Sequence, residues 1–310
     1  MNMEVKKQKI LIVGSTGFLG FNVTKRLLKK YEIFSITKNT KVKKKNRKLN
    51  KVKYFFFDIS NRKNFNKYKS KIPQIDYVIN FGGEIVHNKK NVVNKTHYVG
   101  AKNLMKFFLK KKIKLFIQIG SSMEYGQSCS PQKEDIKCKP ISFYGKAKLN
   151  ATLYAQRIYR RNKFPVIILR LYQVYGPYQN DRRLIPFVFK NCLAKKSFPC
   201  SSGIQKRDFL YINDFVNCIE VILAKKKHKL GEIYNVGFGN SLFIKDVIQK
   251  IVSIAKGGYP KYGLIKLRQE ETNNTFPNIM KVTNHYKWKP KTNLNQGLKK
   301  TFEYYKLKKE

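Results

Sequence analysis

The chain has 310 residues, of which 42% are apolar and 14% aromatic, so it can bury a sizeable globular core. It carries 66 Lys and Arg against 18 Asp and Glu, a formal net charge of +48. Such a surplus would ordinarily indicate a nucleic acid or an anionic membrane surface as partner. However, the lysines are spread along the chain and no aromatic residues interleave with them as a stacking platform, so we expect neither partner.

The rare residue types exclude further classes of protein. Five cysteines without a C-x-x-C pair fit reduced thiols in a cytoplasm better than a disulfide framework or a zinc site. With four histidines, no metal site is expected. No segment approaches the roughly 20 apolar residues that a membrane span needs. We therefore expect a cytoplasmic protein.

The first half of the chain alternates between strand-like and helix-like segments. Residues 10–13 form a continuously apolar, β-branched run, which is typical of a strand buried on both faces. Further strands are expected at 32–37, 52–57, 77–80, 115–119 and 166–171, and helices at 22–30, 92–110 and 146–161. This rhythm predicts an α/β fold with a doubly wound parallel Rossmann sheet.

Beyond residue 172 the regularity fades. Short helices are expected at 185–195, 212–225 and 244–255, among segments rich in Gly, Pro and aromatic residues. These features predict a smaller C-terminal α+β lobe over residues 173–310. Segments around 207–240 could return to the main sheet.

A glycine-rich turn follows the first strand and opens a helix. Its three glycines, Gly14, Gly17 and Gly20, would let backbone N–H groups approach a pyrophosphate at the helix N-terminus. Residues 1–172 are therefore predicted to form an NAD(P)-binding domain. Within the same turn, the expected cofactor contacts also include Thr16, Phe18 and Leu19.

Lys38 follows the second strand, where an NAD-binding protein usually has an acidic residue. Lys38 and the lysines shortly after it would attract a 2′-phosphate, so NADP is favoured, with NAD as the alternative. Asp58 and Ile59, after the third strand, are placed to meet the adenine. Asp58 could instead cap a helix.

Tyr144 and Lys148 are four residues apart in a predicted helix. This spacing puts a phenol beside an ammonium group, whose positive charge favours the phenolate. A tyrosine so placed can exchange a proton near neutral pH. Alone the pair is weak evidence, because a chain with 66 basic residues produces Tyr-x-x-x-Lys by chance.

From residue 10 to about 305, the chain resembles the extended short-chain dehydrogenases/reductases, the NAD(P)-dependent nucleotide-sugar epimerase/dehydratase/reductase family. The matching stretches occur in the family's order: 14–20, 58–59, 80–83, 121–126, 144–148, 169–177, 205–211, 231–237 and 288–290. Together and in this order, the stretches identify the family far more specifically than any single stretch does.

The resemblance implies that Ser121, Tyr144 and Lys148 are catalytic. The Ser121 hydroxyl and the Tyr144 phenol would bind a sugar oxygen, while Lys148 holds the nicotinamide ribose. Hydride would pass between nicotinamide and a sugar carbon as Tyr144 donates or removes the proton. The resemblance also places three residues beside the cofactor: Phe81, Gly82 and Gly83.

Arginines indicate the substrate class, because guanidinium groups suit a dianionic pyrophosphate. Arg207 and Arg268 match the family's phosphate-binding arginines, and Gln173 stands where relatives often have an Asn. Glu271 is placed to hold the nucleoside ribose, and Ser122 to contact the sugar. The C-terminal lobe is thus expected to bind a nucleotide sugar, and the protein to be a homodimer.

The residues after Ser121 bear on the reaction. The family's 4,6-dehydratases have an Asp-Glu pair there, whereas this chain has Ser122 and Met123, which argues against a dehydratase. Reduction of a nucleoside-diphosphate 4-keto-6-deoxyhexose and 4-epimerisation with permanently held NAD remain. Lys38 favours the reductase, which would act in deoxysugar and surface-polysaccharide synthesis.

One departure from the family is His97, which replaces the Asn usual before Gly100.

A different class of function is a non-catalytic relative that binds nucleotides or RNA. Such members usually lose the Tyr/Lys pair, and this chain keeps it. The sequence therefore favours an enzyme.

Overall fold

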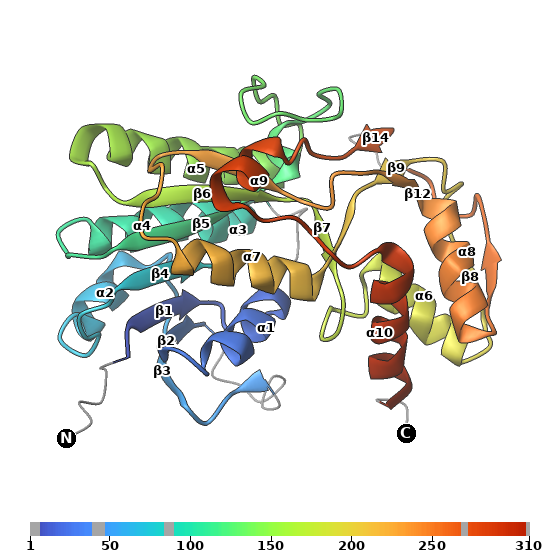
Figure 1. The fold of residues 1–310 in the computed structure, drawn as a ribbon, viewed down its shortest axis with the longest axis horizontal. Helices are drawn as coiled ribbons and strands as arrows, with labels where there is room; N and C mark the ends of the chain where they lie inside the picture. The colour runs from blue at the N-terminus through green and yellow to red at the C-terminus, as the bar shows by residue number, and fades with distance from the viewer. Residues whose placement is uncertain (1–6, 39–46, 84–89, 268–271, 308–310) are drawn as a thin grey trace. The chain divides into compact units, whose positions relative to one another are not determined.

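The computed structural model describes residues 7–38, 47–83, 90–267 and 272–307 (Figure 1). The chain divides into two compact units. Residues 1–124, 140–170 and 225–234 form the first unit, and residues 125–139, 171–224 and 235–310 form the second.

A seven-stranded parallel sheet is the centre of the Rossmann fold, so the predicted fold class is confirmed. Its strands, in spatial order, are β11 (Ile233–Val236), β6 (Val166–Leu171), β5 (Leu115–Ser121), β4 (Tyr77–Asn80), β1 (Lys9–Val13), β2 (Glu32–Thr37) and β3 (Val52–Phe56). β11, the last of these strands in the sequence, returns to the sheet beside β6.

Helices of the first unit alternate with these strands. They are α1 (Phe18–Leu27), α2 (Arg62–Tyr68), α3 (Lys90–Asn94), α4 (Gly100–Phe108) and α5 (Phe143–Asn162), with a π-helical turn η2 (Lys95–Val99) and a 3₁₀ turn η3 (Ser122–Glu124). The single helix expected over 92–110 is thus three successive segments, because the π-helical turn interrupts its α-helical geometry.

Apolar side chains cover both faces of the sheet, as a parallel sheet requires. Leu11 and Val13 of β1 belong to one core cluster, together with Leu104 of α4 and Ala155 of α5. Ile10 and Ile12, which alternate with them along β1, are also completely buried. Full burial of each such side chain stabilises the fold by about 1.5–3 kcal/mol.

Strand register brings the carboxyl ends of four neighbouring strands to one edge. Val13 of β1 is paired with Ile36 of β2 and with Asn80 of β4, and Asn80 is paired with Gln118 of β5. The glycine turn, Lys38, residues 81–83 and Ser121 all follow these positions. Parallel pairing therefore assembles, at one edge, segments that lie far apart in the sequence.

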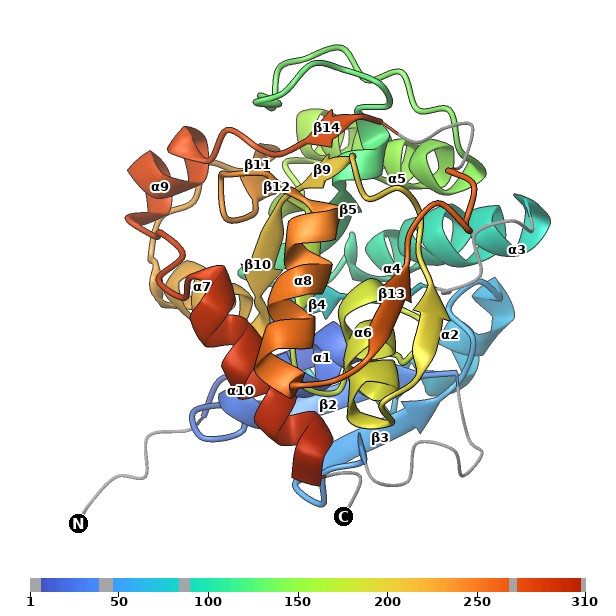
Figure 2. The same cartoon turned by 90° about the vertical axis from the view of Figure 1, so that its right-hand side faces the viewer.

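The second unit contains short strands and helices. Its strands are β7 (Gln173–Tyr175), β8 (Ser197–Pro199), β9 (Lys206–Arg207), β10 (Phe209–Tyr211), β12 (Leu242–Phe243), β13 (Tyr259–Lys261) and β14 (Asn274–Thr275). They form three small sheets, β10-β7, β12-β9-β14 and β13-β8. Its helices are α6 (Leu184–Leu193), α7 (Ile212–Ala224), α8 (Ile244–Ala255), α9 (Met280–Tyr286) and α10 (Leu294–Leu307). Figure 2 shows α6, α8 and α10, which pack against one another.

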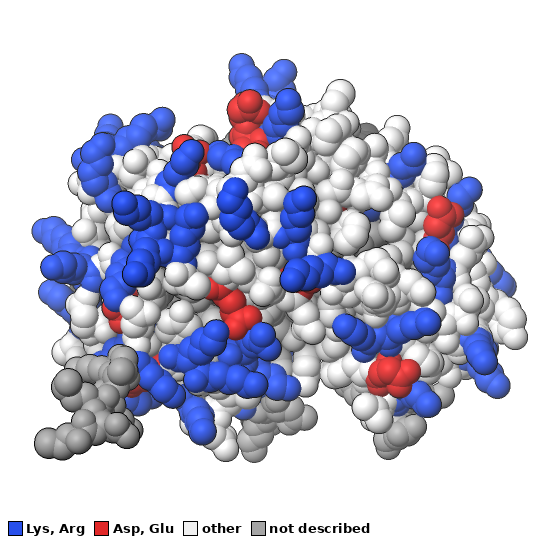
Figure 3. All heavy atoms as spheres, viewed as in Figure 1, with Lys and Arg blue, Asp and Glu red and all other residues white. Residues whose placement is uncertain are grey.

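Across the visible face, Lys and Arg side chains are scattered over many elements, with few acidic groups between them (Figure 3). None of the five cysteines forms a disulfide. Among the described residues, no helix is long and apolar enough to span a membrane, and no three His, Cys, Asp or Glu side chains are grouped as metal ligands.

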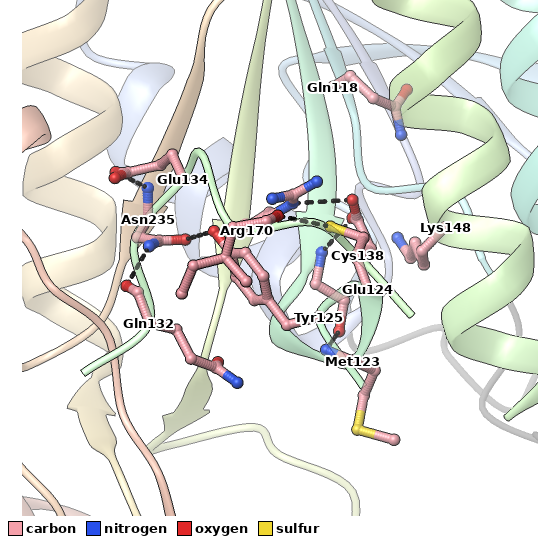
Figure 4. A network of polar contacts seen from close by, with 12 residues as sticks. Gln118, Met123, Glu124, Tyr125, Gln132, Glu134, Cys138, Lys148, Arg170 and Asn235 are labelled. Carbon is pink, nitrogen blue, oxygen red and sulfur yellow. Dashed lines mark hydrogen bonds and ion pairs between the residues drawn. The ribbon is translucent and has the colours of Figure 1, made fainter. Parts of the chain in front are cut away.

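A buried hydrogen-bond network organises the segment 125–139 of the second unit (Figure 4). The Asn235 side chain accepts from the Tyr125 hydroxyl at 2.7 Å and donates to the carbonyl of Gln132 at 2.9 Å. Its backbone N–H donates to Glu134 at 2.8 Å. One completely buried amide therefore fixes this segment at two points.

Replacing Asn235 by Ala should lower the free energy of unfolding by about 2–4 kcal/mol, because Tyr125 and Gln132 each lose a buried partner. Urea denaturation measures this loss. Asn240→Ala is the matched control, since Asn240 is exposed and its hydrogen bond to Asp208 comes from the backbone. An equal loss in both variants would contradict a special role of the network.

Candidate active site

Ser121 is the last residue of β5, and the turn η3 begins directly after it. The backbone N–H of Met123 donates to the Ser121 Oγ at 3.2 Å. Because one lone pair of the hydroxyl is occupied in this way, its proton remains available for donation to another acceptor. Ser122 is partly exposed and Met123 is exposed.

Glu124 is the last residue of the turn η3, and its carboxylate accepts two hydrogen bonds. One carboxylate oxygen accepts the backbone N–H of Ser121 at 2.8 Å, and the other accepts Arg170 Nε at 2.9 Å. Glu124 has no exposed surface and Arg170 is 2% exposed. The sequence signal for Glu124 is the Ser-x-x-Glu spacing of a capping box, whereas Arg170 has no comparable local signal.

Helix α5 carries Tyr144 and Lys148. Its first turn is capped by Ser142, whose side chain accepts the N–H of Gly145 at 3.0 Å. Gly145 lies against the turn after Ser121, since a Cβ at this position would be 2.3 Å from the carbonyl oxygen of Met123. The glycine therefore allows α5 to approach the Ser121 turn closely.

Lys148 is buried and fixed. Its Nζ donates to the carbonyl of Ile119 at 2.9 Å, two residues before Ser121, and lies 5.8 Å from the centre of the Tyr144 ring. Tyr144 itself is partly exposed. Within the first unit, the structure thus brings together the predicted catalytic residues through the end of β5 and the first two turns of α5.

A chain of hydrogen bonds connects Lys148 with the segment 80–83. The side chain of Gln118 also donates to the Ile119 carbonyl, at 3.1 Å, and accepts from the Asn80 side chain at 2.9 Å. Asn80 in turn accepts the N–H of Gly82 at 3.0 Å. Gln118, whose place beside Lys148 is visible in Figure 4, was missed in the sequence because a lone polar residue in a strand carries no signal.

His97 contacts the ring of Tyr144. Its ring lies edge-on to the Tyr144 ring, with the centroids 4.9 Å apart. A Cβ on Gly83 would lie 2.3 Å from the His97 ring, so Gly83 leaves room for it. His97, which replaces the family's usual Asn, therefore places an imidazole against the Tyr144 ring.

The glycine turn brings the start of α1 close to the end of β1. Gly14 adopts φ +80° and its carbonyl accepts the N–H of Gly17 at 2.9 Å. A Cβ on Gly20 would lie 2.3 Å from the Gly14 oxygen, so Gly20 allows α1 to begin against β1. Phe18 and Leu19 open α1 and are partly exposed, while Thr16 is buried against Thr37.

Lys38 and Asp58 form an ion pair of 3.1 Å in which Lys38 is largely exposed. Burial acts to raise the pKa of Asp58, but the hydrogen bonds from Ser60 and the Lys38 charge outweigh it and hold that pKa below its usual value. Asp58 does not cap α2, whose cap is Asn61. Its neighbour Ile59 is buried against Gly100, and Phe81 is partly exposed.

The second unit has a cavity of about 380 Å³. Two predicted substrate residues, Gln173 and Arg207, line it together with Arg182, Ser201 and apolar side chains of α8. Arg207 is buried and donates to the carbonyl of Lys206. Arg182 was missed, because an exposed arginine has no distinctive signal in this chain. Arg268 and Glu271 lie outside the described residues.

The model of the NAD dependent epimerase/dehydratase family matches residues 10–237. The chain belongs to this family. The recognised resemblance and the prediction of an enzyme are thereby confirmed.

Members of the family differ in what they do. The dTDP-D-glucose 4,6-dehydratase of Mus musculus is 27% identical over 96% of this chain and 89% of its own length. The dTDP-glucose 4,6-dehydratase of Bacillus anthracis, solved in complex with NAD, has a TM-score of 0.86 at 25% identity, covering 97% of each chain. The UDP-glucose 4-epimerase of Thermotoga maritima, solved with UDP-glucose, has a TM-score of 0.89 at 22% identity, covering 98% of this chain and 100% of that one.

Gly145→Ala should lower turnover with a nucleotide sugar roughly ten- to a hundredfold, because the added Cβ must push α5 away from the Met123 carbonyl and displace Tyr144. Steady-state kinetics and melting temperature measure the effect. Gly257→Ala is the matched control, since its Cβ would also crowd a carbonyl, that of Cys192, at 2.9 Å. Equal losses of turnover in the two variants would mean that only stability was affected.

Proposed function

We propose that this enzyme transfers hydride between a nicotinamide dinucleotide and C4 of a nucleoside-diphosphate sugar, with Tyr144 as proton donor and acceptor. The observation that carries the proposal is the placement of Lys148, which presents its ammonium group beside Tyr144 while bonded to the Ile119 carbonyl. Tyr144, held beside this ammonium group on the same helix, is placed to give a proton to a sugar oxygen or to take one from it.

Ser121 supports this chemistry as a hydrogen-bond donor. The Met123 N–H already occupies one lone pair of the hydroxyl, so Ser121 directs its proton to the sugar oxygen beside Tyr144. The nicotinamide, when bound, supplies or accepts the hydride. The glycine turn fits its pyrophosphate, because Gly20 lets α1 begin against Gly14 and the backbone N–H groups at a helix N-terminus bind anions.

We assign the nucleoside diphosphate to the cavity of the second unit. Arg207 and Arg182 line it and can bind a pyrophosphate, and Gln173 adds an amide. Relatives solved with UDP-glucose or UDP-glucuronic acid support this substrate class. A cytoplasmic homodimer remains our expectation, and size-exclusion chromatography tests the dimer.

The proposed reaction is reduction of a 4-keto-6-deoxyhexose. Elimination of water needs an accessible acid near Ser121, but Met123 cannot act as one. Glu124 cannot replace it, because both its carboxylate oxygens are engaged and the side chain is completely buried. The similarity to 4-epimerases supports 4-epimerisation as the second candidate.

A panel of UDP-, dTDP-, CDP- and GDP-4-keto-6-deoxyglucose with NADPH or NADH distinguishes these reactions. Loss of absorbance at the nicotinamide band supports the reductase. Interconversion of UDP-glucose and UDP-galactose, together with NAD released only on denaturation, supports the epimerase. Conversion of an unoxidised nucleotide sugar to a 4-keto-6-deoxy product would overturn the argument from Met123 and Glu124.

Tyr144→Phe should lower turnover by at least about a hundredfold, because the proton donor is lost, while the dissociation constant of the cofactor changes little. Steady-state kinetics and fluorescence titration with the reduced cofactor measure both quantities. Tyr154→Phe, a loss of hydroxyl further along α5, is the control and should leave turnover unchanged. Near-normal turnover of the Tyr144→Phe variant would contradict the proposed mechanism.

The cofactor preference is proposed to depend on Lys38. The NAD-bound relatives support a nicotinamide dinucleotide, and the exposed Lys38 ammonium favours one with a 2′-phosphate. Lys38→Ala should weaken NADPH binding about tenfold and leave NADH binding within about twofold. Lys53→Ala, which removes another exposed lysine paired with an acid, is the control. Equal effects on both cofactors would show that Lys38 does not read the 2′-phosphate.

A further inference from the structure

The ion pair between Glu124 and Arg170, which is bonded to the backbone of Ser121, takes no part in the proposed chemistry. Glu124 and Arg170 are joined at 2.9 Å and are almost completely withdrawn from solvent (Figure 4). Removing two charges from water costs free energy that their attraction only partly returns, so apolar residues of similar volume often stabilise a core as well or better. Stability alone therefore does not explain the pair.

Three features of the structure connect the Glu124 side chain with Ser121. The same carboxylate that binds Arg170 accepts the Ser121 N–H at 2.8 Å. A Cβ on Gly120 would lie 2.6 Å from that carboxylate oxygen, so glycine at 120 leaves room for it. The three-residue turn between Ser121 and Glu124 also supplies the Met123 N–H that binds the Ser121 hydroxyl.

We infer that Glu124, held by Arg170, is a positioning residue that sets the orientation of the Ser121 hydroxyl. Arg170 fixes one carboxylate oxygen, and the other fixes the backbone of Ser121 and hence the direction of its Cα–Cβ bond. The inference rests on the proposed role of Ser121 as a hydrogen-bond donor to the sugar oxygen. It adds a requirement for turnover that lies outside the residues touching substrate or cofactor.

The sharpest test is Glu124→Gln, which keeps the volume of the side chain but has only one oxygen. Arg170 is the stronger donor and should take that oxygen, leaving the amide NH₂ facing the Ser121 N–H. We expect kcat to fall about tenfold, the effect of roughly one lost hydrogen bond, while KM changes less than about threefold. The assay uses NADPH and whichever 4-keto-6-deoxyglucose of the panel the wild type reduces fastest, or UDP-glucose if it epimerises.

Adding Arg170→Met should then restore kcat to within about threefold of wild type, because the amide oxygen is free to turn back to the Ser121 N–H. A role in stability alone predicts no such rescue. If Glu124→Gln does not fold, Glu124→Gln/Arg170→Met is compared with Glu124→Val/Arg170→Met, neither of which has an uncompensated buried charge. The Gln variant should then be about tenfold faster, and equal rates would overturn the inference.

Asp76 offers a matched control. Its carboxylate also accepts a backbone N–H, that of Lys9 at 2.8 Å, and binds a cation, Lys114, at 3.1 Å. Asp76 precedes β4 and Lys9 begins β1, so this bridge lies at the amino end of the strands, away from Ser121. Asp76→Asn should change melting temperature but not kcat.

Ser121→Ala separates this inference from the proposed function. If Glu124 acts through Ser121, then Glu124→Gln should change kcat less than about threefold in the Ser121→Ala background. Equal losses in both backgrounds, or no loss in either, would overturn the positioning role alone. Near-normal turnover of Ser121→Ala itself, or a wild type that turns over no sugar of the panel, would overturn the proposed function and the inference with it.

Discussion

The hydrogen bond from Lys148 to the carbonyl of Ile119 connects the two elements on which the candidate chemistry depends. It joins helix α5 to strand β5 two residues before Ser121, so the orientation of the lysine and the end of the strand are set together. Gln118 donates to the same carbonyl and is bonded in turn to Asn80, on the neighbouring strand. In a buried environment such bonds are costly to break, because no water replaces the lost partner. These bonds to the strands of the parallel sheet therefore set the position of Lys148 relative to Ser121.

Much of this arrangement could be predicted from the sequence, because it follows from local rules. β2 and β4 have the bounds expected from their apolar runs, and the turn from Gly14 to Gly20 follows β1 as predicted. The i, i+4 spacing of Tyr144 and Lys148 was informative because both residues lie in one continuous helix. These features depend on periodicity and on backbone conformation, which a sequence records directly.

What could not be predicted depends on contacts between distant residues. Glu124 and Arg170 are 46 positions apart, and the Ser-x-x-Glu spacing that indicates a capping box does not show which residue pairs with the second carboxylate oxygen of Glu124. The interrupted helix at His97 was equally hidden, since its apolar spacing continues through the π-helical turn. The segment 125–139 belongs to the second unit through Asn235, a partner about a hundred residues later in the chain. Polar side chains that act only through a distant partner leave no pattern in the sequence.

The net charge of +48 is interpreted differently when buried and exposed charges are considered separately. Among the described residues, the buried charged side chains are three basic ones (Lys148, Arg170, Arg207) and three acidic ones (Glu124, Asp208, Asp214). In the part of the chain that the structure describes, the excess of lysine therefore lies at positions where water solvates the charge and substitution costs little. Inside, a charge is retained only where a hydrogen bond or an opposite charge compensates it, as at Glu124 and Lys148. The few buried charges, and not the many exposed ones, are consequently the better guide to what this protein does.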